Sequence, residues 1–128
     1  MARKVPPSAY AVPREATTSR RSSINPFGTN RLKEWQMPEG GTTLGQAAAQ
    51  LQHETARKFR SLINQSQFGS VAEFARNNPE ISYERLRAIL TGDMWMRFED
   101  IAFLADRMAV QLTMNLEPTR GKGARENL

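Results

Sequence analysis

The signals that start and stop helices lie close together between residues 70 and 92. Ser70 is a good N-cap and Glu73 follows three residues later, which is the pattern of a capping box. Asn78 precedes Pro79, and a proline disfavours helical backbone at the residue before it and lacks a backbone donor. One long helix is therefore excluded here. The pattern predicts two short helices joined by a tight turn.

The second of these helices is expected to start after Ile81, with Ser82 as its N-cap. Gly92 stands where a glycine commonly ends a helix. The inward face follows helical spacing and consists of Leu86, Ile89 and Leu90. The other faces carry Tyr83, Glu84, Arg85, Arg87 and Ala88, and of these we expect Tyr83, Arg85 and Arg87 to point outward. This helix is thus predicted to present a polar surface on an apolar base.

Longer helices are predicted on both sides of this pair. One covers about residues 43–65, and its apolar face consists of Leu44, Ala48, Leu51, Thr55, Phe59 and Leu62, widened near the end by Ile63. The other covers about residues 98–109, and its apolar face consists of Phe98, Ile101, Leu104, Ala105 and Met108. Over residues 110–117 apolar and polar residues alternate, which predicts a short C-terminal β-strand that ends at Pro118.

Residues 1–41 show neither a helical nor an alternating period. They are rich in Pro, Ser, Thr, Arg and Gly, which is typical of a flexible tail. Their large apolar residues, Phe27, Leu32 and Trp35, leave open whether this tail docks onto the domain or a partner, or stays solvated. Residues 118–128 are polar and basic and are expected to form a second flexible tail.

The net charge of +5 lies outside the predicted helices. Lys and Arg number 7 against 3 Asp and Glu in residues 1–40, and 3 against 1 in residues 119–128. Residues 41–118 hold 8 against 9, a net charge of −1. Many solvated tails are basic, so the overall charge is a weak indication of a nucleic-acid partner.

The chain lacks the residues that several functional classes require. The chain has no cysteine and one histidine, His53, which we expect at a surface or boundary position. No ligands are spaced for a metal, and Glu99 and Asp100 are adjacent, so their side chains diverge on a helix. No apolar run is long enough for a membrane span. We therefore expect a cytoplasmic protein that is not an enzyme and has no metal, cofactor or small-molecule ligand.

From Phe59 to about Leu112 the sequence resembles the Cro and lambda-repressor type of domain, the XRE family. The residues that carry the resemblance are Phe74 and Ala75, Ile81 and Ser82, Leu86, Ile89, Leu90 to Gly92, and Phe98 to Met108. The turn between Ala75 and Ile81 is one residue longer than in that family, and Ser70 stands where the family often has a glutamine.

This resemblance implies a mainly α, four- to five-helix, lambda-repressor-like helix-turn-helix bundle. The patterns described above add a short C-terminal strand and a disordered N-terminal tail. It implies a regulator of transcription that binds double-stranded DNA through residues 42–117, of bacterial, phage or mobile-element type. The residues expected to contact DNA are Ser70, Ser82, Tyr83, Glu84, Arg85 and Arg87. The alternative is a protein-interaction module on the same fold, such as an antitoxin or a secretion accessory.

Two further expectations concern partners. A lone strand at residues 110–117 leaves its backbone donors and acceptors unpaired, so we expect a homodimer through an antiparallel ribbon of two copies. The alternative is that the strand pairs with the chain's own first tail, near residues 27–35. The basic residues expected to follow DNA phosphates along the first tail are Arg3, Lys4, Arg14, Arg20 and Arg21.

Overall fold

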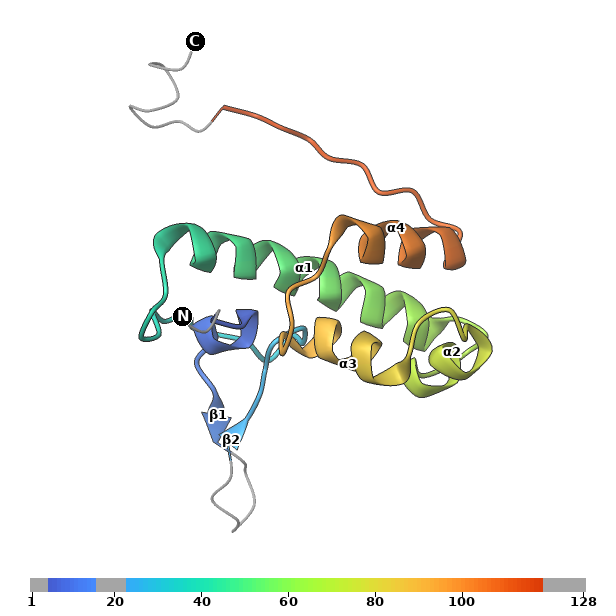
Figure 1. The fold of residues 1–128 in the computed structure, drawn as a ribbon, viewed down its shortest axis with the longest axis horizontal. Helices are drawn as coiled ribbons and strands as arrows, with labels where there is room; N and C mark the ends of the chain where they lie inside the picture. Colours follow the sequence, from blue (N-terminus) through green and yellow to red (C-terminus); the bar gives the residue numbers. More distant parts are fainter. Residues whose placement is uncertain (1–4, 16–22, 119–128) are drawn as a thin grey trace.

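The computed structural model describes residues 5–15 and 23–118 and is mainly helical (Figure 1). Its α-helices are α1 (Thr43–Gln65), α2 (Val71–Asn77), α3 (Tyr83–Thr91) and α4 (Phe98–Arg107). The N-terminal part adds the 3-10 helix η1 (Pro7–Tyr10) and the antiparallel strands β1 (Arg14–Glu15) and β2 (Ser23–Ile24). The four helices lie where the sequence predicts them, although α4 ends two residues earlier than expected. Across the described ranges, every helix is too short or too polar to cross a membrane.

Local capping fixes where the helices begin and end. Thr42, Ser70 and Ser82 each use the side-chain hydroxyl to accept the backbone N–H three residues ahead, at 2.9, 3.1 and 3.1 Å. The buried amide of Asn78 donates to the carbonyl four residues back, at 2.8 Å, and closes α2. Gly92 ends α3 with a left-handed backbone, φ 80°, as a C-terminal glycine does.

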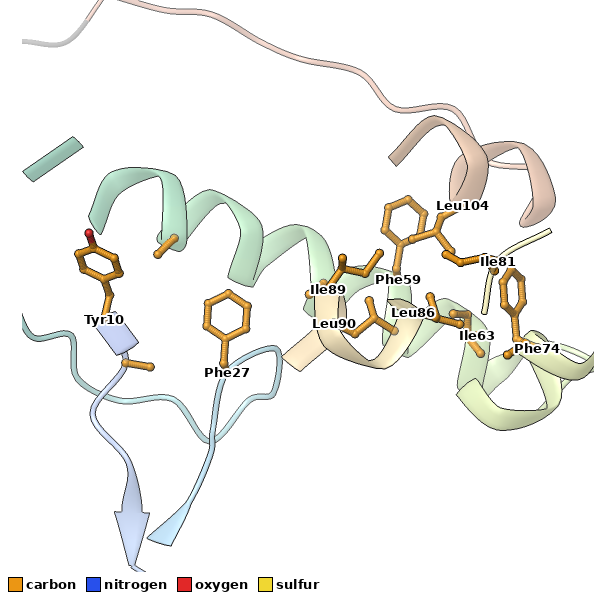
Figure 2. Close-up of a cluster of buried hydrophobic side chains, with 14 residues drawn as sticks. Tyr10, Phe27, Phe59, Ile63, Phe74, Ile81, Leu86, Ile89, Leu90 and Leu104 are labelled. Atoms are coloured by element: carbon orange, nitrogen blue, oxygen red, sulfur yellow. The ribbon is translucent and has the colours of Figure 1, made fainter. Parts of the chain in front are cut away.

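Helix α1 is the axis of the core (Figure 2). Its buried apolar face consists of Ala49, Ala56, Phe59 and Ile63. Figure 2 shows Tyr10 and Phe27 along the first half of α1, and the side chains of α2, α3 and α4 gathered around its second half. The core therefore has two parts joined by one helix, and the N-terminal segment supplies one of them.

The predicted apolar face of α1 is confirmed at Phe59 and Ile63, which are buried, and is wrong at its leucines. Leu44 is 83% exposed, Leu51 is 72% exposed and Leu62 is 36% exposed, whereas Ala49 and Ala56 are fully buried. The leucines mark the more hydrophobic stripe, but the small alanines allow η1 and α3 to approach the helix closely. On α4, Phe98 is likewise exposed rather than buried, while Leu104 is buried as expected.

Parts of residues 5–15 and 23–41 pack on the helices, so the expectation of a disordered tail is wrong for this segment, although β1 and β2 project away from the helices (Figure 1). Tyr10, Ala11 and Phe27 are at most 3% exposed. The segment has no period of its own because its order comes from contacts with distant residues: Ser8 N–H donates to the Gly92 carbonyl at 2.8 Å, and the Trp95 indole donates to the Val5 carbonyl at 2.8 Å. The body that includes α1 to α4 thus starts near residue 5 instead of residue 42.

Four of the basic residues expected to follow phosphates, Arg3, Lys4, Arg20 and Arg21, lie outside the described residues, as do residues 119–128 of the second tail. Arg14 is described and lies exposed in β1.

The expected C-terminal strand is not formed. Residues 110–118 have no regular secondary structure, and in Figure 1 they leave the end of α4 and run clear of the helices. The alternating side chains Leu112, Met114 and Leu116 are all exposed. Alternation specifies the faces of a strand but supplies no partner for its backbone, and the described part of the chain offers none.

His53 is buried, contrary to expectation, and joins the N-terminal segment to α1. Its Nδ1 accepts the Gly28 backbone N–H at 2.8 Å, so the ring proton must lie on Nε2. The rings of Phe27 and Trp35 meet it edge to face, with centroids 5.5 and 5.6 Å away. A protonated His53 would lose its acceptor and break this link.

This burial predicts a pH-dependent stability. Desolvation lowers the pKa of His53 below its usual value, against the smaller opposing effect of Glu54, whereas Arg57 lowers it further. Below about pH 6.5 the unfolded chain takes up a proton that the folded chain does not, so the free energy of unfolding should fall as the pH falls from about 7 to about 5. Urea denaturation across this range measures it. His53→Gln, which keeps an acceptor for Gly28, should flatten the profile; an equally steep profile in the variant would assign the effect to other groups.

Candidate functional site

Helices α2 and α3 form a compact pair with the predicted turn between them. They pack against each other and against α1, and their shared core contains Phe74, Ile81 and Leu86. The turn is tied by Asn78, whose carbonyl accepts the Ile81 N–H at 3.2 Å. Pro79 follows the end of α2, and Ser82 opens α3. The sequence thus sets two short helices against one another with little freedom between them.

One face of α3 is exposed and polar. Tyr83 is 46% exposed, Glu84 is exposed, and the side chain of Arg87 is 42% exposed. Tyr83 and Arg87 are four residues apart, so they lie one above the other on the helix. The guanidinium of Arg87 pairs with the Asp93 carboxylate at 3.0 Å, just beyond the end of α3. These side chains lie where sequence reasoning placed them.

Arg85 does not point outward, which corrects the sequence-based expectation for this side chain. Its Nε and Nη2 donate to the two Asp100 carboxylate oxygens at 3.2 and 2.6 Å, and its side chain is 21% exposed. The same carboxylate accepts the Arg97 backbone N–H at 2.8 Å and so caps α4. Asp100 is therefore a buried link between α3 and α4. Periodicity alone placed Arg85 away from the inward face, but a side chain this long reaches the neighbouring helix.

The other end of α3 is held by Gln52 of α1, a buried residue that sequence reasoning missed. Its amide nitrogen donates to the carbonyls of Ile89 and Met94, both at 2.9 Å, and its amide oxygen accepts the Met96 N–H at 2.8 Å. Three hydrogen bonds use most of the capacity of one amide. A glutamine among apolar positions of a predicted helix is the signal that could have indicated this role.

The remaining expected site residues, Ser70 and Ser82, are N-caps in the structure. Both hydroxyl oxygens accept a backbone N–H, and each hydroxyl keeps its own proton to donate. The reciprocal half of the capping box at Ser70 is replaced, because the Glu73 carboxylate pairs with Arg76. Ser70 is half-buried and Ser82 is exposed, so Ser82 is the more accessible donor beside Tyr83.

Two arginines of α1 lie beside the loop at residues 28–30 and were missed. Arg60 Nη1 lies 3.4 Å from the position that a Cβ on Gly28 would occupy. Arg57 stands one turn earlier, and its Nη2 pairs with Glu54 at 2.8 Å. No sequence signal marks this pair, because the loop at residues 28–30 that encloses it comes from the segment expected to be a tail.

Comparisons of the chain with protein-family models, with curated proteins and with solved structures found no match. The resemblance to the XRE family therefore rests on the residues that carry it and stays a prediction. The structure agrees with the expected bounds of α2 and α3, and this agreement concerns the helices alone.

Asp100→Ala should destabilise the fold. It leaves the half-buried Arg85 guanidinium without its carboxylate and uncaps α4, so we expect the free energy of unfolding to fall by about 2–4 kcal/mol in urea denaturation. Asp106→Ala, on the exposed side of the same helix, is the matched control and should change stability by less than about 0.5 kcal/mol. Equal stability of both variants would contradict the role of Asp100.

Proposed function

We propose that this protein binds double-stranded DNA, with α3 facing the major groove. The observation that carries the proposal is that α3 is held in place by other parts of the protein, yet one of its polar faces is exposed. Asp100 and Gln52 secure the helix, and Tyr83 and Arg87 remain exposed on it. A short second helix fixed in this way is how helix-turn-helix proteins present side chains to base edges.

The charges of this face suit DNA at particular points. Arg87 can exchange the exposed Asp93 carboxylate for a phosphate or for the O6 and N7 atoms of a guanine. The hydroxyls of Tyr83 and Ser82 can donate to phosphate oxygens. Glu84 would repel phosphate, so it must either accept from a cytosine amino group or remain in solvent. In this proposal Arg85 positions α3 through Asp100 and does not contact DNA.

We further propose that the protein works as a homodimer through residues 110–117. The alternating side chains of this segment are exposed in the single chain, and an antiparallel ribbon of two copies would pair its backbone and gather its apolar face. The exposed Phe98 of α4 and Leu51 of α1 supply apolar surface against which such a ribbon can pack. A symmetric pair would also present two α3 helices to two half-sites.

The alternative, a protein-interaction module, is favoured by a different observation. The exposed stripe of α1 contains Leu44, Ala48 and Leu51, and such surfaces commonly mark protein interfaces. Because the N-terminal segment packs on the helices, partner binding through a disordered tail is no longer an argument for this alternative. Absence of binding to any duplex at low salt would support this alternative against DNA binding.

Arg87→Ala should weaken binding to a duplex selected from a random pool by about 1–3 kcal/mol and relax the preference at one base pair. Fluorescence anisotropy measures the affinity, and thermal unfolding checks the fold. The matched control is Arg107→Ala on α4, which also removes an exposed, ion-paired arginine. If both variants bind the duplex as the parent does, α3 does not make the contact.

Thr113→Pro should convert a dimer to a monomer. Thr113 is exposed and makes no hydrogen bond within the described part of its own chain, so the proline removes a donor needed only between copies. Light scattering at tens of micromolar should give a dimer for the parent and for Thr113→Ser, and a monomer for Thr113→Pro. A monomeric parent protein would refute the ribbon.

A further inference from the structure

One arginine of the helices differs from all the others. In α1 to α4, every arginine except Arg60 pairs with a carboxylate, and the paired ones are Arg57, Arg76, Arg85, Arg87 and Arg107. Arg60 makes no hydrogen bond or ion pair with any described residue, although its side chain is half-buried. Burying a guanidinium costs free energy when no counter-charge accompanies it. This burial lowers the pKa of Arg60.

The surroundings of Arg60 form an open depression of about 490 Å³ between α1 and residues 28–30. Its wall also contains Arg57, Ser61 and Asn64, and none of the residues that line it is acidic. Arg57 Nη1 lies 3.4 Å from the Asn30 side-chain oxygen, which holds this second guanidinium at the rim. Glu54, beyond the rim, already neutralises part of the Arg57 charge, so Arg60 is the main cation of the depression.

The backbone at Gly28 comes close to the end of α3, and this close approach shapes the depression beside Arg60. Gly28 has φ 77°, and a Cβ at this position would lie 2.3 Å from the Leu90 carbonyl oxygen and 3.4 Å from Arg60 Nη1. Only a glycine therefore allows the loop to lie against the end of α3 at this distance. The hydrogen bond from Gly28 to His53 fixes the loop in place. The packed N-terminal segment thus builds the wall opposite Arg60.

We propose that Arg60, with Arg57 beside it, forms a phosphate-binding pocket that holds one backbone phosphate of the DNA contacted by α3. The planar guanidinium offers a fork of donors that matches phosphate oxygens, and the hydroxyl and amide at the wall add further donors. Gly28, which lines the depression opposite Arg60, lies against the Leu90 carbonyl at the end of α3, so a bound phosphate would lie beside that helix. Only the source of the phosphate depends on the proposed DNA binding; the pocket itself is inferred without it.

The first arm of the test uses duplex DNA. Arg60→Gln should weaken binding about tenfold for selected and random duplexes alike, because a phosphate contact carries no sequence information. It should also make the slope of log affinity against log salt shallower by about 0.9, the value for one lost contact. Arg107→Gln, with the same change in charge on α4, is the control and should leave both unchanged.

The second arm uses inorganic phosphate and needs no DNA. Titration of the parent protein should shift the NMR signals of the Gly28 amide and the Arg60 Nε–H, and these shifts should be absent in Arg60→Gln and present in Arg107→Gln. Thermal unfolding supplies a third reading: Arg60→Gln should melt at the same or a higher temperature, because Arg60 has no partner to lose. A lower melting temperature would indicate a structural role and overturn the proposal.

The arms separate the two possible failures. Loss of affinity for DNA together with loss of the phosphate shifts supports the pocket as proposed. If the NMR shifts caused by phosphate depend on Arg60 but the affinity for the duplex does not, the pocket does not hold a DNA backbone phosphate. The pocket would then bind a free phosphate group. No dependence on Arg60 in either arm overturns the pocket. If the parent binds no duplex, the proposed function fails, and the titration still decides whether the pocket exists.

Discussion

The amide of Gln52 joins three parts of the chain that are far apart in sequence: α1, the last turns of α3 and the loop that leads to α4. A buried carbonyl that loses its donor costs about 1–3 kcal/mol, and two carbonyls depend on this single nitrogen. An apolar residue of similar size would fill the space and leave both unpaired. The orientation of α3 relative to α1, and with it everything that α3 presents outward, follows from this polar contact inside an apolar core.

The helices could be predicted from sequence because their boundaries are local. Thr42, Ser70 and Ser82 cap the turns that follow them, and Gly92 ends α3, regardless of what packs nearby. The buried face of α1 could be predicted only in part by hydrophobicity, because close packing selected its alanines over its leucines. The apolar residues of the N-terminal segment, such as Phe27, indicated that it could dock, but not where, because its order depends on His53 and Gly92, which lie far along the chain.

The candidate site was predicted in part. Tyr83, Glu84 and Arg87 occupy the exposed face that the helical period assigns to them, whereas Arg85 turns aside because Asp100 lies within its reach. The positive and negative charges of the described helices nearly cancel, so the placement of the individual charges matters more for binding than the net charge. Arg87 must give up Asp93 to meet a phosphate or a base, while Arg60 has nothing to give up. An exchangeable pair favours discrimination between ligands, and an unpaired cation favours capture of any phosphate.

The Trp95 indole donates to the Val5 carbonyl across 90 residues of sequence. Contacts of such wide separation raise the contact order of a small helical protein and slow its folding, because the closure of a long loop must precede the contact. During synthesis, the segment that begins at residue 5 must wait until the loop after α3 has emerged before it can settle. This segment is thus among the last of the described parts to fold, and until then the surface of α1 that it covers remains open to other chains.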